Sequence, residues 1–467
     1  QHMAKLLFTP TAFQKLPIKV EAIRSYHYLR AILLRPRYHR NASPKASSTP
    51  PFHRNASTKA SSAYIHLPFC HKRCHYCDFA IIALGSASNS DYEPLVGDYI
   101  NLLIREIAST NPSPSLRAPL NTIFFGGGTP SLVSPKSVSS ILEALKKSFG
   151  ISNDAEISME MDPGTFDSRK LNDFINLGVN RVSLGVQAFQ EELLQACGRS
   201  HGVKEVYKAI DDVVNCGVHN WSLDLISSLP HQTADMWRES LTIAVEQAQP
   251  NHISVYDLQI EQGTKFGNLY NPGEFPLPSE SQSAEFYKTA SSLISSRGYN
   301  HYEISSYAKP GFECKHNSIY WLNKPFYGFG LSAASFLDGI RFSRPRKMKD
   351  YADYVRKLEN GVMDSSFRDN NAIDDAMDVV MLSLRTANGI DVILFRENFG
   401  DTVLQSILKI WKPYIESGHV ICLGEDRQIV ITYSERIRDL KFVRLSDPEG
   451  FLLSNELISL AFRAISS

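Results

Sequence analysis

Three cysteines lie within eight residues of the stretch YIHLPFCHKRCHYCDFAI. Cys70, Cys74 and Cys77 follow a Cys-x3-Cys-x2-Cys spacing, which offers three soft thiolate ligands from one short loop. A [4Fe–4S] cluster with three protein ligands fits this set and leaves one iron open for an external chelate such as an amino acid. Zinc is the alternative, with His71 or His75 as the fourth ligand.

Short apolar runs alternate with amphipathic helical stretches through the middle of the chain. The expected strands are 63–69, 121–127, 156–162, 181–187, 221–227 and 253–260. The expected helices between and after them are 93–109, 135–149, 167–177, 203–216, 234–247 and 280–297. This alternation predicts a parallel βα architecture, either an open sheet or a barrel, in which ligands bind at the carboxyl ends of the strands.

The stretch FFGGGTPS ends the second expected strand with three consecutive glycines. Glycines permit a close approach between backbone and ligand and leave amide and carbonyl groups available. A tight βα turn is the alternative, and a phosphate-binding loop is disfavoured because no Gly-Lys-Ser/Thr follows.

The cysteine loop after a first strand, with the aromatic Tyr76 before the third cysteine, resembles the radical S-adenosylmethionine (SAM) superfamily. The resemblance implies a partial (β/α)6 barrel and a [4Fe–4S] cluster whose open iron binds the amino and carboxylate groups of SAM. It also implies that an electron from the reduced cluster cleaves SAM to a 5′-deoxyadenosyl radical.

Further motifs resemble the oxygen-independent coproporphyrinogen III oxidase group within that superfamily. Alone, each polar residue at a strand end is more often a capping or structural group. Together they match the SAM-contacting positions of the group, which are Tyr64, Tyr76, Gly127, Gly128, Thr129, Glu160, Gln187, Arg199 and Asp224. The resemblance implies that the glycine-rich stretch holds the SAM ammonium. Arg199 suits the carboxylate and Asp224 suits the ribose hydroxyls.

Two features favour the heme chaperone HemW family over the oxidase within this group. The oxidase pattern continues with a fourth cysteine, where this chain has Phe79. The oxidase also carries an N-terminal arm over its substrate, whereas here the expected barrel follows a basic segment directly. Both differences disfavour decarboxylation of coproporphyrinogen.

The stretch CKHNSIYW resembles the HNxxYW heme-binding motif of that chaperone family. The matching residues are His316, Asn317, Tyr320 and Trp321. Imidazole can ligate heme iron and aromatic rings can pack on a porphyrin, while Cys314 is a rival ligand. The structural alternative is a hydrogen-bonded histidine within a packed loop.

The function expected from the resemblance is a heme chaperone that binds a [4Fe–4S] cluster, SAM and heme and delivers heme to hemoproteins, respiratory or photosynthetic. An electron donor and a homodimer are further expected partners. The alternative is an oxygen-independent coproporphyrinogen III oxidase of porphyrin biosynthesis. Enzymatic activity is left open and no catalytic residue is assigned.

Composition narrows the class of protein. The 467 residues are 43% hydrophobic and 21% charged, with zero net charge, as in ordinary globular proteins. Residues 1–62 hold eleven Lys and Arg against one acid, Glu21, and the remainder holds 38 basic and 48 acidic residues. No basic face therefore predicts nucleic-acid binding, and no apolar run predicts a membrane span. Seven clustered cysteines fit a reducing compartment.

Four regions are expected along the chain. Residues 1–62, basic and almost free of acids, resemble an organelle transit peptide, for the mitochondrion or alternatively the chloroplast; a retained basic arm is the other interpretation. Residues 63–300 form the barrel, and 301–370 form a connecting segment with the HNxxYW motif. Residues 371–467 form a small helical, winged-helix-like α+β domain with strands at 419–424 and 427–433.

Overall fold

The computed structural model describes residues 59–85, 89–110, 118–362, 372–430 and 439–466. Most of the expected transit segment, residues 1–58, therefore lies outside the described residues. The chain divides into two compact units, Lys59–Asp369 and Asn370–Ser467. Within the described parts, no helix combines the length and apolar character needed to cross a membrane.

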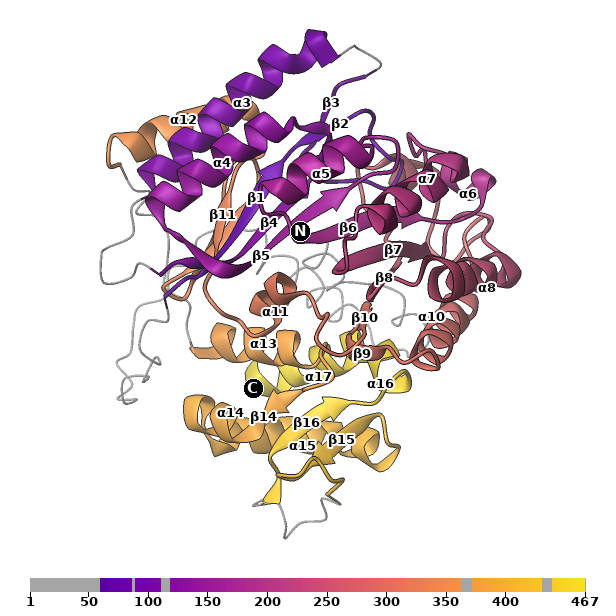
Figure 1. Ribbon diagram of the computed structural model, residues 1–467. Helices are drawn as coiled ribbons and strands as arrows, with labels where there is room; N and C mark the ends of the chain where they lie inside the picture. The colour runs from indigo at the N-terminus through magenta and orange to yellow at the C-terminus, as the bar shows by residue number, and fades with distance from the viewer. Residues whose placement is uncertain (1–58, 86–88, 111–117, 363–371, 431–438, 467) are drawn as a thin grey trace. The chain divides into compact units, whose positions relative to one another are not determined.

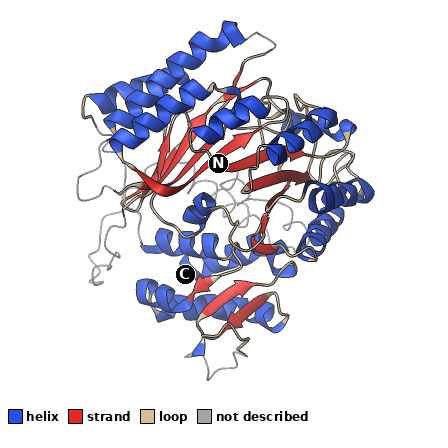
Figure 2. Ribbon diagram, in the orientation of Figure 1, coloured by secondary structure: helices blue, strands red, loops and turns tan. Residues whose placement is uncertain are grey.

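The first unit is built on six parallel strands that neighbour each other in chain order (Figure 2). They are β1 (Ser62–Leu67), β4 (Leu120–Gly127), β5 (Ile151–Met161), β6 (Arg181–Gln187), β7 (Trp221–Ser227) and β8 (His252–Asp257). All six expected strands are present, and the predicted mixed α/β fold with the parallel sheet of a partial barrel is confirmed.

Three short strands extend this sheet beyond the six. Strand β11 (Tyr327–Phe329) pairs in parallel with β1. At the other edge, β10 (Ser306–Ala308) runs antiparallel to β8, and β9 (Asn300–Glu303) pairs with β10. Three short pieces of the segment expected to connect two domains therefore pair with the sheet. A separate hairpin, β12 (Ala334–Leu337) and β13 (Ile340–Ser343), follows β11.

Helices follow the strands and cover the outer face of the sheet (Figure 1). They are α3 (Asn89–Ser109), α4 (Pro135–Ser148), α5 (Ser168–Asn176), α6 (Glu191–Ala196), α7 (Val203–Asn215), α8 (Ala234–Thr242), α10 (Glu280–Ser295) and α12 (Met348–Glu359). Helix α8 continues as a π-helical stretch, Ile243–Ala248. Local signals set the starts: the Ser134 side chain caps α4 ahead of Pro135, and Asp167 caps α5. The short α6 was not predicted.

The two faces of the central strands differ in chemistry. Residues such as Ile123, Phe125 and Met159 face the helices and are fully buried in the apolar core. The alternate residues face the lumen and include many buried polar side chains: Ser62, Thr122, Glu156, Ser158, Arg181, Ser222, His252 and Ser254. Because buried polar groups require partners, this lumen is suited to hydrogen-bonded networks or a polar ligand.

The second unit combines helices with a small antiparallel sheet. Its helices are α13 (Ala372–Ser383), α14 (Val392–Phe399), α15 (Asp401–Glu416), α16 (Glu449–Leu452) and α17 (Ser454–Ser466), and its sheet has the order β14 (Ile390–Asp391), β16 (Phe442–Leu445), β15 (Val420–Leu423). The expected strand 419–424 is β15. Its main partner is the unpredicted β16. The expected strand 427–433 contributes one bridge, between Ile429 and Leu423, and 431–438 lie outside the described residues.

Candidate functional site

The cysteine loop leaves the barrel at the carboxyl end of β1. Cys70 ends the short strand β2 (Phe69–Cys70), which pairs in parallel with β3 (Ile82–Ala83). Cys74 and Cys77 lie in the loop between these strands, joined by a turn in which the Cys77 N–H donates to the Cys74 carbonyl at 3.1 Å. The two paired strands fix the ends of the loop, so the three thiols are confined to one small region.

Arg73 holds the backbone of this loop together. Its guanidinium donates to the carbonyls of Cys77 at 3.1 Å and Phe79 at 2.9 Å, and to that of Ile81 at 3.4 Å. Phe79, the position of the oxidase's fourth cysteine, thus contributes a backbone acceptor to the clamp. Its side chain has no atom able to ligate iron.

Two of the three thiols accept hydrogen bonds from residues of the barrel. The Thr129 hydroxyl donates to Cys70 Sγ at 3.5 Å, and Arg199 Nη1 donates to Cys74 Sγ at 3.4 Å. Donors directed at sulfur stabilise thiolate character, as the ligands of an iron–sulfur cluster require. Burial raises the pKa of Cys70 to about 12, and a bound metal would favour the thiolate.

Three thiols are suitable ligands for an iron–sulfur cluster, although their sulfur atoms do not point to a common centre in this structure. Over the described residues, no three His, Cys, Asp or Glu side chains lie close enough to hold a metal ion. The three cysteine side chains must therefore turn toward a common point to bind one. None of the three forms a disulfide.

The zinc alternative loses one of its two candidate histidines. His75 Nδ1 lies 2.8 Å from the Ala196 carbonyl, and His75 Nε2 lies 3.0 Å from Lys265 Nζ, at the start of α9 (Lys265–Leu269). The same ring packs on Gly198, where an added Cβ would lie 2.6 Å from it. With both nitrogens engaged, His75 anchors the loop to the barrel and offers no atom to a metal.

The glycine-rich stretch at the end of β4 packs directly against the cysteine loop. An added Cβ on Gly128 would lie 2.6 Å from the Phe69 carbonyl, which accepts a hydrogen bond from the Thr129 N–H at 2.7 Å. Gly127 has a φ of +115°, which favours glycine, and its N–H donates to Glu160 Oε2 at 3.2 Å. The stretch therefore connects the cysteine loop to an acidic side chain of β5.

Three predicted SAM contacts lie in the lumen at the carboxyl half of the strands. Burial, with the nearby Asp224 carboxylate, raises the pKa of Glu160 to about 7. Asp224 accepts hydrogen bonds from the hydroxyls of Ser183 at 2.8 Å and Ser222 at 2.9 Å. Gln187 is buried and its Oε1 has no hydrogen-bond partner. Such a buried, unsatisfied acceptor is what a donor group of a bound ligand would satisfy.

Tyr64 lies inside the lumen beside these groups. Its hydroxyl is 3.2 Å from His66 Nδ1, and its ring stacks on Phe124 with 6.2 Å between centroids. An added Cβ on Gly126 would lie 2.9 Å from the Tyr64 ring and 3.2 Å from Glu160 Oε2. Tyr64 thus touches the glycine-rich stretch, as a contact to the same ligand requires.

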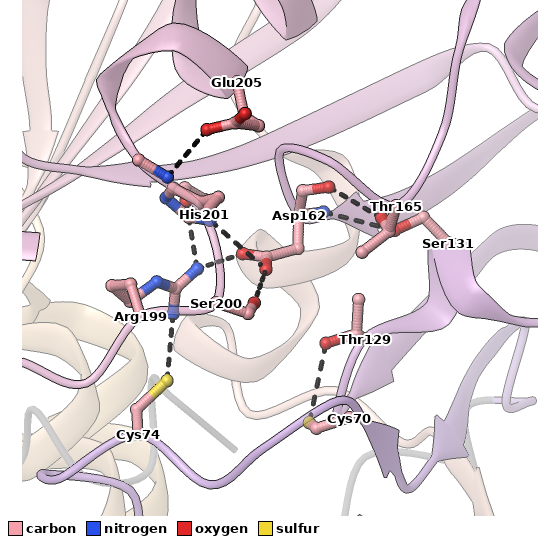
Figure 3. A network of polar contacts seen from close by, with 12 residues as sticks. Cys70, Cys74, Thr129, Ser131, Asp162, Thr165, Arg199, Ser200, His201 and Glu205 are labelled. Atoms are coloured by element: carbon pink, nitrogen blue, oxygen red, sulfur yellow. Dashed lines mark hydrogen bonds and ion pairs between the residues drawn. The ribbon is translucent and has the colours of Figure 1, made fainter. Parts of the chain in front are cut away.

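Arg199 lies at the centre of a polar network that reaches the cysteine loop (Figure 3). It forms an ion pair with Asp162 and donates to the Tyr76 hydroxyl at 3.0 Å, in addition to Cys74 Sγ. Asp162 also accepts a hydrogen bond from the Ser200 hydroxyl at 3.3 Å. Burial raises the pKa of Asp162, but the positive charge of Arg199 lowers it more, so the pKa of Asp162 is lowered. The Arg199 guanidinium is therefore positioned to bind an anionic group of a ligand beside the cysteines.

Asp162 was not among the residues predicted from the sequence. The residue lies two positions after Glu160, in the stretch MEMDPGT, so the two-residue period of a strand places both carboxylates on the same side. That period is the signal that could have identified it.

The HNSIYW motif lies elsewhere, on the helix α11 (Lys315–Trp321), which contacts β4. His316 is fully buried: its Nδ1 lies 2.7 Å from Thr122 Oγ1 and its Nε2 lies 2.8 Å from the Tyr320 hydroxyl. Burial lowers the pKa of His316 to about 3, so the ring is neutral. Thr122 is near the amino end of β4, so this group lies at the opposite end of the lumen from the cysteine loop.

The other members of the motif are half-buried at Asn317 and Tyr320 and buried at Trp321. The Asn317 N–H donates to Cys314 Sγ at 3.5 Å, which caps α11, and Trp321 is buried with its Nε1 unpaired. Cys314 is itself buried, which raises the pKa of its thiol to about 12. The structure therefore gathers the predicted cluster and SAM residues at one end of the barrel and the predicted heme residues at the other.

Comparison with known proteins gives the family. The model of the radical SAM superfamily matches residues 64–244. The heme chaperone HemW of Synechocystis is 40% identical over 404 residues, which cover 86% of this chain and 97% of the relative. The chain belongs to the HemW heme chaperone family. HemW membership, within the radical SAM superfamily, confirms the family suggested by the motifs.

Two further proteins are similar to this chain, one with lower coverage and one with lower sequence identity. A mitochondrial radical SAM domain-containing protein 1 of Danio rerio is 30% identical over 58% of this chain and 59% of its own length. Among solved structures, the coproporphyrinogen III oxidase HemN of Escherichia coli superposes with a TM-score of 0.69 at 21% identity, covering 87% of this chain and 90% of that chain. This second likeness shows a shared fold, and HemW membership rests on the sequence relatives.

Proposed function

We propose that this HemW-family protein binds heme and passes it to acceptor hemoproteins. The observation that carries the proposal is the 40% identity to a heme chaperone along 97% of that relative's length. Phe79 supports it, because the oxidase pattern continues with a fourth cysteine at that position. The Arg73 clamp on the Phe79 carbonyl gives the residue a structural role instead.

We further propose that Cys70, Cys74 and Cys77 hold a [4Fe–4S] cluster. When bound and reduced, the cluster would supply the electron that cleaves SAM. The protein's own groups would bind and orient the cofactor: Arg199 the carboxylate, and the glycine-rich stretch with Glu160 the amino group. Asp224, already fixed by Ser183 and Ser222, would accept from the ribose hydroxyls.

The heme site is a separate question. His316 as axial ligand stays a prediction, since Nε2 must leave the Tyr320 hydroxyl before it can reach iron. Cys314 meets a similar obstacle because it is buried and its thiol pKa is raised. Ligation by either residue would therefore require α11 to move.

One experiment separates the chaperone from the oxidase. The protein is reconstituted anaerobically with iron and sulfide, and portions of one sample are titrated with heme and assayed with SAM and coproporphyrinogen III. We expect stoichiometric heme binding and transfer to an apo-hemoprotein, without decarboxylation. Turnover of the porphyrinogen without heme binding would reject the proposal and favour the oxidase.

The organelle and the partners of the protein are proposals that no contact among the described residues carries. We propose that residues 1–62 direct the chain to the mitochondrion, supported by their basic composition and by the mitochondrial relative from Danio rerio. Import of a protein fused to residues 1–62 into isolated mitochondria would support this proposal, and import into isolated chloroplasts alone would support the chloroplast.

An electron donor and a second copy of the chain are proposed partners. Reduction assays would test the electron donor, and sedimentation of the reconstituted protein would test the homodimer.

A further inference from the structure

Aromatic rings connect the HNSIYW helix to the proposed SAM pocket through the lumen. The His316 ring stacks on Phe124, with centroids 5.2 Å apart and planes 29° apart. Phe124 in turn stacks on Tyr64, with 6.2 Å between centroids and planes 21° apart. The Tyr64 ring lies against Gly126. A Cβ atom added at Gly126 would lie 2.9 Å from that ring and 3.2 Å from Glu160 Oε2. A continuous column of contacts therefore runs from α11 to the glycine-rich stretch.

The strand geometry explains this column. Thr122, Phe124 and Gly126 are alternate residues of β4, so all three face the lumen. Thr122 binds His316, and Gly126 touches Tyr64 and Glu160. The strand rises about 13 Å from Thr122 to Gly126, so this column links α11 to the pocket through the side chains that lie between them.

A second connection consists of hydrogen bonds. The Cys314 N–H, at the start of α11, donates to the Tyr302 hydroxyl at 3.3 Å, and that hydroxyl lies 2.8 Å from His252 Nε2. His252 Nδ1 lies 2.8 Å from the Ser222 hydroxyl, which donates to Asp224 Oδ1 at 2.9 Å. The chain ends on the residue proposed to bind the SAM ribose.

The direction of donation is consistent along this whole chain. Each hydroxyl can donate once while it accepts, and a neutral histidine donates from one nitrogen and accepts at the other. Ser222 donates to Asp224, so His252 donates from Nδ1 and accepts at Nε2 from Tyr302. Burial lowers the pKa of His252 well below its ordinary value, which keeps the ring in this neutral form. A chain with one consistent orientation restricts the positions of all its members.

Helix α11 is itself fixed to the barrel by Glu156. This buried carboxylate, the register partner of Thr122, accepts from the His316 N–H at 3.3 Å and lies 3.9 Å from Cys314 Sγ. Loss of the His316 ring contacts would leave buried hydroxyls on Thr122 and Tyr320 unsatisfied, which is costly. The helix is therefore held in one position, and both connections start from it.

We propose that His316 is a positioning residue for SAM. Helix α11 packs on β4 and fixes Tyr64, Glu160 and Asp224 through the two connections. The inference rests on the proposed SAM binding. It assigns the HNSIYW histidine a role inside the barrel that does not depend on heme.

The test compares variants of the reconstituted full-length protein. His316→Phe preserves an aromatic ring against Phe124 but removes both hydrogen bonds, and Tyr320→Phe removes only the bond to Nε2. We expect SAM to bind roughly 10-fold more weakly to His316→Phe, a typical coupling between distant sites, and about 3-fold more weakly to Tyr320→Phe. Iron content and heme stoichiometry should match the wild-type protein.

A matched control separates positioning from general destabilisation. Trp237→Phe removes a buried hydrogen bond, from Nε1 to the Phe286 carbonyl at 2.8 Å, in the outer helical layer. We expect it to lower the melting temperature without weakening SAM binding. Hydrogen exchange in the metal-free proteins should increase at residues 120–128 and 221–225 in His316→Phe, but not in Trp237→Phe.

Three outcomes are distinguishable. A wild-type protein that binds no SAM rejects the proposed cofactor site. Normal SAM affinity in His316→Phe, with a changed heme spectrum, rejects the positioning role and supports iron ligation by His316. Equal losses of SAM affinity in His316→Phe and Trp237→Phe, in proportion to their melting temperatures, show that His316 contributes only stability and also overturn the inference.

Discussion

Arg199 and Asp162 form an ion pair in which both side chains are largely buried, with exposed fractions of 10% and 13%. The pair joins β5 to the loop after α6 and places a guanidinium beside Cys74. The Asp162 carboxylate neutralises the buried Arg199 charge when no ligand is bound. It also fixes the side of Arg199 that remains available to an incoming anion.

Removal of one partner should be strongly destabilising. Asp162→Asn keeps the size of the side chain but leaves Arg199 buried without its counter-ion, so we expect the free energy of unfolding to fall by about 3 kcal/mol. Glu246→Gln is the control, since its pair with Arg297 is about half exposed and should contribute little. Urea unfolding of the metal-free proteins measures both, and equal stabilities would contradict the prediction.

SAM affinity should rise with pH near neutrality. The pKa of Glu160 is about 7, raised by burial and by Asp224, and the ionised carboxylate accepts a hydrogen bond from an amino N–H more strongly than the protonated acid does. Below pH 7 the ligand-free protein must lose a proton to bind, so affinity should increase from pH 6 to pH 8. Equilibrium dialysis of the reconstituted protein measures this change.

The variant Glu160→Gln should bind SAM more weakly and without this pH dependence. Glu303→Gln is the matched control, because burial raises the pKa of Glu303 to about 7 as well, yet no SAM contact is predicted there. A pH dependence that persists in Glu160→Gln, or disappears in Glu303→Gln, would assign the titration to another group.

The buried neutral ring of His316 should make the protein sensitive to acid. Its pKa is about 3 in the folded protein and near 6.5 when unfolded, so protonation below pH 6.5 favours unfolding. At pH 5 the cost is about 2 kcal/mol. Glu160 and Glu303 act in the opposite direction because their folded pKa values are raised, so the total change does not isolate one histidine.

The comparison with His316→Phe does isolate it. Between pH 7 and pH 5, the variant should lose about 2 kcal/mol less unfolding free energy than the wild-type protein. Urea unfolding at both pH values gives this difference. Parallel losses in the two proteins would show that the ring is already protonated or exposed in the native state.

The cysteine loop should be the only origin of the iron signal. Cys74→Ala should abolish the brown absorbance of the reconstituted protein and reduce bound iron from about four atoms per chain to near zero. Cys422→Ala, at a buried cysteine of the second unit, is the control and should retain both. Stoichiometric zinc in the wild-type protein as isolated, with no bound iron after reconstitution, would overturn the cluster assignment.

Much of the barrel could be predicted from sequence because its signals are local. Each strand is a short apolar run bounded by a helix start such as Ser134 or a helix stop such as Gly178. The additional strand β11 could not be predicted in this way, because three residues carry no period and its partner β1 lies more than 250 positions earlier. Strand pairing over such a distance depends on the assembled barrel.

The site was predictable to the extent that motifs name residue types. They named the cysteines, the glycine-rich stretch, Glu160 and Asp224 as predicted cluster or SAM contacts, and they named His316 as a predicted heme contact. They could not show that both His316 nitrogens are already bonded, because Thr122 comes from a strand 194 positions away. Whether a histidine is a ligand or a buried structural group depends on such distant partners.

Gly128 offers a test of the contact between the glycine-rich stretch and the cysteine loop. In Gly128→Ala the new methyl group would lie 2.6 Å from the Phe69 carbonyl, a backbone atom beside Cys70 that cannot move alone. We expect the cysteine loop to shift, with weaker SAM binding and less iron retained after reconstitution. Gly97→Ala, in α3 with no atom within 4 Å of its added Cβ, is the control and should be neutral or stabilise by roughly 0.5–1 kcal/mol. Wild-type iron content and SAM affinity in Gly128→Ala would mean that the two segments adjust independently, and the close packing between them would then have no role in the site.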